Sequence, residues 1–185
     1  MSPGQKKIEK LFYKKWEAEM LPILLGDKMT DIRYCYIYEK FYADNPNLVK
    51  TLDVGDPLKH NVRTHLCINV KFQNNSILIP LRKNLGNPNR KFGRIGFSVP
   101  SKSKPNAGLD YRYIMIINDS QYIRFDVPRI SNSQIKIIEN NYKTIEKEAI
   151  DYIKAYVRVA RKGRVSMTAR FRESSLVNFH NELNI

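Results

Sequence analysis

The fold is decided by residues 64–82, THLCINVKFQNNSILIPLR. Apolar residues occupy every second position on both arms of this stretch: Leu66, Ile68 and Val70, then Ile77 and Ile79. Because successive side chains of a β-strand point to opposite faces, this spacing predicts two strands. The segment between them, residues 73–75, is Gln-Asn-Asn, and asparagine favours turns. The stretch therefore predicts an antiparallel β-hairpin.

More strands are expected outside the hairpin. Residues 32–38 are rich in Tyr and Ile, and residues 111–118 and 122–125 are two further strand-like stretches. Residues 41–48 predict a short turn or helix, since Pro46 interrupts them.

The second half of the chain predicts helices. Ser131 and Gln134 match a capping box, in which two side chains satisfy backbone groups at a helix start. Apolar residues then recur in steps of three and four over residues 135–159, and Gly163 suits a helix end. We expect one long helix here and a short one over residues 175–183. Strands followed by long helices indicate an α+β domain.

The beginning of the chain differs from the rest. Residues 3–25 predict an amphipathic helix, which Gly26 and Asp27 end. We therefore expect a helical extension over residues 1–28 and a single domain over residues 29–185.

Positive charge is concentrated in the middle of the chain. Residues 61–113 contain ten Lys or Arg and a single acid, Asp110, whereas residues 114–155 contain six bases and six acids. The whole chain carries a net charge of +14. Concentrated positive charge on a folded domain attracts polyanions, because their binding releases counterions. Nucleic acid is therefore the first partner to consider.

Composition excludes several other classes. The 42% hydrophobic residues are typical of a folded protein rather than a disordered one. No apolar run reaches the roughly 18–20 residues that span a bilayer, so no membrane association is expected. Cys35 and Cys67 lack metal-ligand spacing and suggest buried thiols in the reducing cytoplasm.

Residues 83–107 form a long excursion with few apolar side chains and three prolines. A short strand is possible at residues 95–99. A loop of this length within a compact domain is usually functional or disordered.

Known catalytic motifs are missing from the sequence. There is no phosphate-binding glycine loop, no His-Glu-x-x-His and no zinc knuckle. Carboxylates are almost absent from the basic centre, although metal-dependent cleavage of nucleic acid normally needs several. We therefore expect no metal and no cofactor. RNA permits metal-free cleavage, because its 2′-OH can attack the adjacent phosphate once a proton acceptor, a proton donor and cations are supplied.

Three cations are expected to meet where the hairpin joins the excursion. Arg82 and Lys83, followed by Asn84, end one strand, and hairpin pairing brings Arg63 back toward them. They could surround a single phosphate. The alternative is that they are solvated strand ends that hold RNA without specificity.

Other residues are assigned more weakly. RNA binding is expected from Asn84 and from a set of basic residues in and after the excursion: Arg90, Lys91, Arg94, Lys102, Lys104 and Arg112. Bases near the end of the long helix (Arg158, Arg161, Lys162 and Arg164) fit the helix dipole, and RNA contact is a second explanation. His65 is a possible proton carrier and His180 a packed helix residue. Tyrosines such as Tyr111 and Tyr113 could stack on bases or belong to the core.

Several of these stretches, in this order, resemble one known family. They are residues 41–48 (FYADNPNL), Arg63, residues 79–84 (IPLRKN), residues 108–111 (GLDY) and residues 178–183 (NFHNEL). Over roughly residues 30–185 the chain resembles the toxins of type III toxin–antitoxin systems, the ToxN/AbiQ superfamily, and within it the TenpIN branch.

The resemblance implies a compact, strongly bent antiparallel sheet similar to the Kid/MazF barrel. It also implies a metal-independent endoribonuclease that leaves a 2′,3′-cyclic phosphate. The partners it implies are RNA substrates and an inhibitory RNA antitoxin with pseudoknot repeats, with which related toxins assemble into closed rings. Such systems often stop phage-infected cells.

By the same resemblance, Arg63 and residues 82–84 stand where relatives place basic and polar catalytic residues. The chain departs from relatives in two places. Lys83 stands where they usually carry Ser or Thr, and they generally lack residues 1–28. The rival interpretation is a non-catalytic protein that binds structured RNA. A DNA-binding regulator is a weaker third, since the sequence shows no helix-turn-helix spacing.

Overall fold

The computed structural model describes residues 32–52, 65–68, 72, 74–90 and 93–185, with only the backbone described for residues 65–68 and 90. The contacts of the chain divide it into two units, Met1–Asp31 and Ile32–Ile185, and all described residues lie in the second. The expected extension over residues 1–28, Arg63 and Lys91 thus lie outside the described residues.

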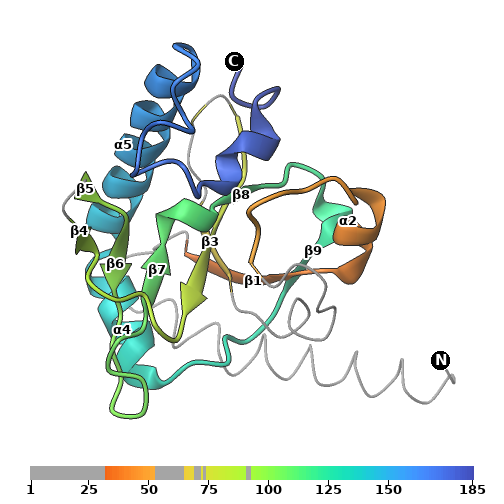
Figure 1. Ribbon diagram of the computed structural model, residues 1–185. Coiled ribbons are helices and arrows are strands. Elements are labelled where there is room, and N and C mark those ends of the chain that lie inside the picture. Colours follow the sequence, from red (N-terminus) through yellow and green to blue (C-terminus); the bar gives the residue numbers. More distant parts are fainter. Residues whose placement is uncertain (1–31, 53–64, 69–71, 73, 91–92) are drawn as a thin grey trace, which may run out of the picture. The chain divides into compact units, whose positions relative to one another are not determined.

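The centre of the second unit is an antiparallel sheet in the order β6-β7-β3-β2-β1-β9 (Figure 1). Its strands are β1 (Arg33–Ile37), β2 (His65–Ile68), β3 (Ile77–Arg82), β6 (Gly96–Ser98), β7 (Gly108–Asp110) and β9 (Ile123–Phe125). The predicted hairpin is confirmed, because β2 pairs with β3 from His65 opposite Pro80 to Ile68 opposite Ile77. The strand predicted over residues 32–38 is confirmed as β1.

Strand β3 has two partners along its other edge. Its start pairs with β8 (Met115–Ile116), and its end pairs with β7. Between these partners the chain makes a 3₁₀ turn, η1 (Tyr111–Tyr113). The strand predicted over residues 111–118 is therefore wrong at its beginning. The Asp110 carboxylate accepts the Arg112 backbone N–H and so favours a turn there.

The barrel expected from the resemblance is not found. Among the described residues, the strand order begins at β6 and ends at β9, and no pairing joins these two strands. The described strands thus form an open sheet, and the likeness to Kid/MazF stays a prediction. The α+β class, the antiparallel pairing and the long helix after the sheet are confirmed.

The excursion over residues 83–107 is packed onto the sheet rather than loose. It contains the ribbon of β4 (Asn89–Arg90) and β5 (Gly93–Arg94), then β6 inside the strand expected at 95–99. Leu85 is buried, and a Cβ placed on Gly108 would lie 2.4 Å from its side chain and 2.6 Å from the Phe97 carbonyl. Only glycine allows this close approach, which fixes the excursion against β7.

The region predicted as one long helix holds two, α4 (Asn132–Asn140) and α5 (Tyr142–Ala160), so that prediction is wrong at Asn141. The Asn141 side chain donates to the Ile137 carbonyl at 2.7 Å and competes with the helical backbone pattern. The capping box of Ser131 and Gln134 is confirmed.

The predicted end of the long helix is also confirmed. Gly163 has a positive φ of 65°, and its N–H donates to Ala160 while Arg164 donates to Val159. These two bonds form a Schellman motif.

Three short elements complete the unit: α2 (Glu39–Asp44), η2 (Ser120–Tyr122) and η3 (Ser175–Phe179). The first confirms a short helix near the turn or helix expected at residues 41–48, although it begins two residues earlier and ends at Asp44. The last confirms a short helix after residue 175, although its form is 3₁₀.

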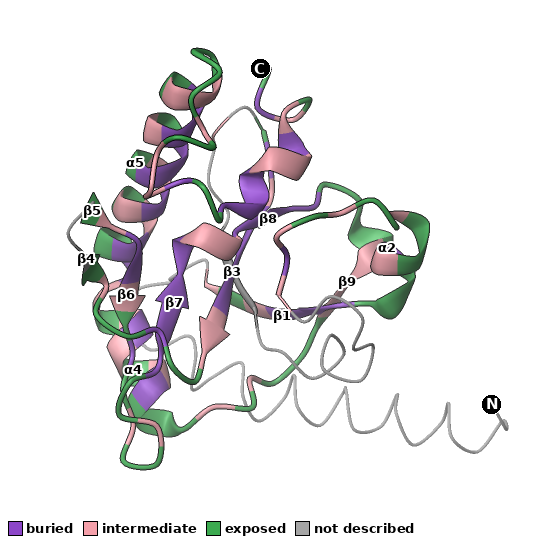
Figure 2. Ribbon diagram, in the orientation of Figure 1, coloured by how far each residue is buried: buried purple, intermediate pink, exposed green. Residues whose placement is uncertain are grey.

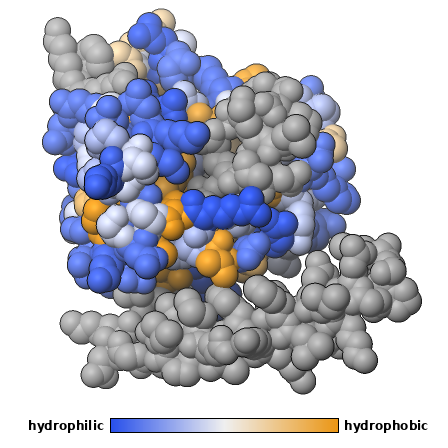
Figure 3. Space-filling view, turned by 90° about the horizontal axis from the view of Figure 1, so that it is seen from below, coloured by the Kyte–Doolittle hydropathy of each residue, from blue (hydrophilic) through white to orange (hydrophobic). Residues whose placement is uncertain are grey.

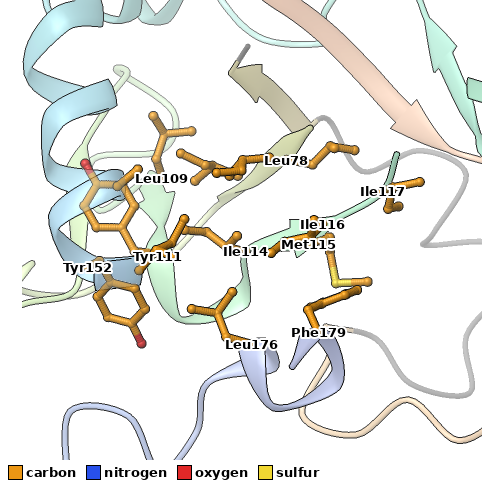
Figure 4. Packing of buried hydrophobic residues seen from close by; sticks show 14 of the residues in the cluster. Leu78, Leu109, Tyr111, Ile114, Met115, Ile116, Ile117, Tyr152, Leu176 and Phe179 are labelled. Carbon is orange, nitrogen blue, oxygen red and sulfur yellow. The ribbon is translucent and has the colours of Figure 1, made fainter. Parts of the chain in front are cut away.

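The core lies between α5, the sheet and η3. Figure 2 shows the buried side of α5 facing the sheet, and Ile145, Ala149 and Tyr152 on that side have no exposed surface. In Figure 4, Tyr111 of η1 and Ile114, which directly follows η1, lie with Leu176 of η3 in this core. No helix in the described ranges is long and apolar enough to cross a membrane.

Candidate functional site

A buried carboxylate lies at the end of the central strand. Arg82 is the last residue of β3 and lies opposite Gly108 in β7. Asp110 ends β7, and its side chain has 0% exposure. Arg82 Nη1 donates to Asp110 Oδ2 at 2.9 Å. The β3–β7 register therefore brings together two charged residues that are 28 positions apart in the sequence.

Arg112 holds the same carboxylate from the other side. Its Nε donates to Asp110 Oδ1 at 2.9 Å and its Nη2 donates to Oδ2 at 2.6 Å. This two-pronged contact is the strongest geometry available to an Arg–carboxylate pair. The hydrogen bond with Asp110 raises the pKa of Arg112. Only 12% of the Arg112 side chain is exposed, so its role is mainly to hold Asp110.

The cluster carries net positive charge at the surface, since two guanidinium groups share one carboxylate. Arg82 keeps 30% of its side chain exposed. Tyr113 lies beside both arginines, with the Arg82 and Arg112 guanidinium carbons 5.2 Å and 5.6 Å from its ring centroid. The 3₁₀ turn η1 buries Tyr111 and leaves Tyr113 half-buried. The available surface is therefore a fixed cation beside an aromatic ring.

A second network begins at the next residue. The Tyr111 hydroxyl donates to Glu148 Oε2 at 2.9 Å, and Arg94 Nε lies 2.9 Å from the same oxygen as an ion pair without hydrogen-bond geometry. Arg170 Nη2 donates to the Arg94 carbonyl at 2.7 Å. These contacts join the β4–β5 ribbon to α5. Arg94 is 38% exposed and thus available to an outside anion on its free side.

The buried tyrosines are poor proton acceptors. Burial raises the pKa of Tyr111, and the neighbouring Glu148 raises it further. Burial likewise raises the pKa of Tyr152 and Tyr34. Tyr156 contacts His180 Nε2 at 2.9 Å, and burial raises its pKa to about 12. These phenols keep their protons at neutral pH.

Within the described ranges, the remaining predicted site residues are not among the partners of the Asp110 carboxylate. Lys83 and Asn84 are exposed directly after β3, and Lys102 and Lys104 lie in the turn that the Ser101–Lys104 bridge closes. For His65 and Arg90 the side chains are not described, and Arg63 and Lys91 lie outside the described residues. Of the predicted site residues, the structure thus unites Arg82 and Arg112.

Sequence reasoning missed the residue that unites them. Asp110 stood out as the single acid among ten bases and as part of the GLDY stretch, but it was given no role in the site. That isolation was the available signal, because an acid kept within a basic segment is often paired. The face shown in Figure 3 is largely hydrophilic over its described part, with smaller hydrophobic areas between. No group of three or more His, Cys, Asp or Glu in the described ranges could hold a metal ion.

Comparisons with known proteins give matches among solved structures. No protein-family model and no curated protein matches the chain. A chain from a bacterial antiviral system regulated by a processed non-coding RNA aligns with a TM-score of 0.53 and 18% identity, over 76% of this chain and 93% of that one. A chain from work on type III toxin–antitoxin systems, in which an RNA pseudoknot inhibits the toxin, aligns over 83% of this chain and 76% of that one. Its identity is 8%, and its TM-score of 0.39 is too low to show a shared fold.

The first alignment shows the fold. It spans most of both chains, although too few residues are identical to carry over the site. The chain thus shares the fold of a protein from a bacterial antiviral system that a processed non-coding RNA regulates.

Proposed function

We propose that the protein is the toxin of a type III toxin–antitoxin system, a metal-independent endoribonuclease that its own RNA antitoxin inhibits. One observation carries the proposal: a partly exposed arginine, Arg82, is held by a buried carboxylate at the end of the central strand. Lys83 and Asn84 follow it at the surface. The shared fold and the ordered motifs support the same conclusion.

The cluster suits stabilisation of a charged phosphate. In the reaction the 2′-oxygen attacks phosphorus, the bond to the 5′-oxygen breaks, and negative charge builds on the other phosphate oxygens. A cation already fixed in place stabilises that charge without having to reorganise. Asp110 fixes Arg82, and Arg112 offsets the Asp110 charge, so Arg82 stays an effective cation.

Protons must also move in this reaction. One leaves the 2′-OH, and another reaches the 5′-oxygen that departs. We assign phosphate contact or proton donation to Lys83, which stands where relatives carry a hydroxyl. Arg63 completes the catalytic set, Asn84 is assigned to RNA binding, and His65 is the further candidate for proton transfer. The buried tyrosines are not proposed as proton acceptors, because burial raises their pKa values and keeps them protonated.

RNA outside the scissile phosphate would be held by the neighbouring bases. Arg94 joins this surface through Glu148, and Tyr113 offers a ring on which a base can stack. We assign further contacts with the RNA backbone to Arg90, Lys91, Lys102 and Lys104. An antitoxin with pseudoknot repeats would cover the same surface, and a closed protein–RNA ring is the assembly we propose.

Cleavage in the presence of EDTA tests the proposal. The purified protein is incubated with a 5′-labelled RNA and EDTA, and the products are treated with a phosphatase that requires an open terminal phosphate. We expect fragments that resist the phosphatase, because their ends are 2′,3′-cyclic. RNA that is bound but stays whole would favour the rival interpretation, a non-catalytic RNA-binding protein.

A further inference from the structure

A basic pocket lies along α5, and neither Arg82, Asp110 nor Arg112 is among its lining residues. Its volume is about 700 Å³. Four of its lining residues are basic and one is acidic: Lys154, Arg158, Arg161 and Arg170, with Asp151. In Figure 2 the exposed side of α5 faces away from the sheet. The first three bases lie three or four positions apart and so share one helix face.

The single acid does not neutralise this pocket. Asp151 Oδ2 accepts a hydrogen bond from Lys147 at 2.6 Å. This hydrogen bond, together with the charges of Lys154 and Arg158, lowers the pKa of Asp151. Among the described residues, neither Lys154 nor Arg158 forms a hydrogen bond or an ion pair within 4 Å. Like charges four positions apart destabilise a helix, so an anion from outside would relieve a real cost.

The helix dipole does not explain why all four basic residues line the pocket. The dipole favours cations in the last turn, which covers Arg158. Lys154 lies more than one turn before the end of α5 at Ala160. Arg170 belongs to another segment, and its guanidinium stacks 5.3 Å from the ring centroids of Tyr152 and Phe171. Burial lowers the pKa of Arg170, because its guanidinium is partly removed from water.

The pocket is connected to the proposed cleavage site. Arg170 lines the pocket and donates to the Arg94 carbonyl at 2.7 Å. Arg94 pairs with Glu148, which accepts the hydrogen bond of Tyr111, the neighbour of Asp110. A continuous series of contacts therefore leads from one basic surface to the other.

We propose that this α5 pocket binds the phosphate backbone of an RNA strand, as a second contact beyond the cleavage site. Lys154 and Arg161 are separated by seven residues, on the order of 10 Å along the helix, so the bases follow an extended strand better than a single phosphate. The inference rests on the proposed RNA partner and assigns that RNA a further surface.

The test compares two double variants with equal charge loss. Lys154→Ala/Arg158→Ala removes pocket bases, and Lys136→Ala/Lys143→Ala removes exposed bases elsewhere on α4 and α5. The probe is a fluorescent 2′-O-methyl RNA of about 30 nucleotides, which cannot be cleaved because its 2′-oxygen is blocked. Anisotropy gives the affinity between about 50 and 300 mM NaCl.

We expect the pocket variant to bind about tenfold more weakly. The slope of log K against log salt should fall by about 1.4, since each lost single-strand contact removes about 0.7. The matched variant should bind like the wild type. Equal losses in both variants would overturn the inference, and so would displacement of the RNA by polyglutamate at the same charge concentration, which would indicate an acidic protein partner.

Cleavage of the unmodified strand by the wild type is measured separately. If the pocket variant binds RNA more weakly than the matched variant but the wild type does not cleave RNA, the binding surface is supported and only the ribonuclease proposal is refuted. If the wild type cleaves RNA but the two variants bind it equally well, the binding surface is refuted and the ribonuclease proposal stays intact.

Discussion

Replacing Asp110 with Asn removes one charge from the centre of the cluster and changes the shape of the side chain little. The carboxylate has no exposed surface and accepts hydrogen bonds from Arg82 Nη1, Arg112 Nε, Arg112 Nη2 and the Arg112 backbone. Asparagine has one acceptor oxygen, and its NH₂ group would face guanidinium donors. Two guanidinium groups would then lie together without their counter-ion.

The cost can be estimated from this geometry. Removing one partner of a buried ion pair typically costs about 3–5 kcal/mol. Arg82 is 30% exposed and can turn to water, so the lower end, about 3 kcal/mol, is expected. For a domain of this size, each kcal/mol shifts the melting temperature by about 2–4 °C. We therefore expect the Asp110→Asn variant to melt roughly 6–12 °C below the wild type.

Activity gives a second measurement. If Asp110 fixes Arg82 for the transition state, cleavage of RNA by the folded variant should fall by about 10²–10³, the usual effect of losing one such charge-stabilising group. Asp126→Asn is the control, because Asp126 is exposed and lies 3.6 Å from Arg124. Calorimetry and single-turnover cleavage below both melting temperatures provide the data. An Asp110→Asn variant as stable and active as the control would refute the reasoning.

Three further predictions follow from other parts of the structure. Lys83→Ala should leave the melting temperature unchanged, because Lys83 is exposed, and should relieve growth inhibition on expression; equal toxicity would remove Lys83 from the catalytic set. In an anisotropy titration, Tyr113→Phe should bind RNA nearly as well as the wild type, and Tyr113→Leu should bind it about tenfold more weakly. The reason is that the ring of Tyr113, rather than its hydroxyl, contacts Arg82 and Arg112. Equal RNA binding by the two variants would contradict this prediction. The free energy of unfolding should fall as pH rises from about 10 to 12, because burial raises the pKa of Tyr156 to about 12 and only the unfolded chain releases that proton readily. Urea titrations at several pH values should show a shallower fall for Tyr156→Phe, and parallel curves would exclude this contribution.

Much of the fold follows from short-range patterns. The alternation of Leu66 and Ile68 with polar positions, and the spacing around Ile145 and Tyr152, depend only on how side chains project from strands and helices. The capping box at Ser131 and the Gly163 helix end depend on backbone groups within a few residues. Such features are visible in the sequence because the atoms that interact are close along the chain.

The breaks in these patterns were less visible. Asn141 interrupts the apolar periodicity of the helices through one side-chain hydrogen bond, without altering the periodicity itself. Tyr111 lies in a strand-like stretch, yet it is buried in a 3₁₀ turn. The turn occurs because the chain pairs with β3 before this point, as β7, and again after it, as β8. Local propensity gives way where tertiary packing is stronger.

The hairpin, the buried face of α5 and the basic centre of the chain follow from composition and from neighbours along the chain. The position of Asp110 between Arg82 and Arg112, and the contact of Arg170 with Arg94 beside the α5 pocket, could not be predicted in this way. Those pairings depend on the register of β3 against β7 and on how a distant segment packs. Charge interactions fall off with distance in space, and distance in space is what the fold sets.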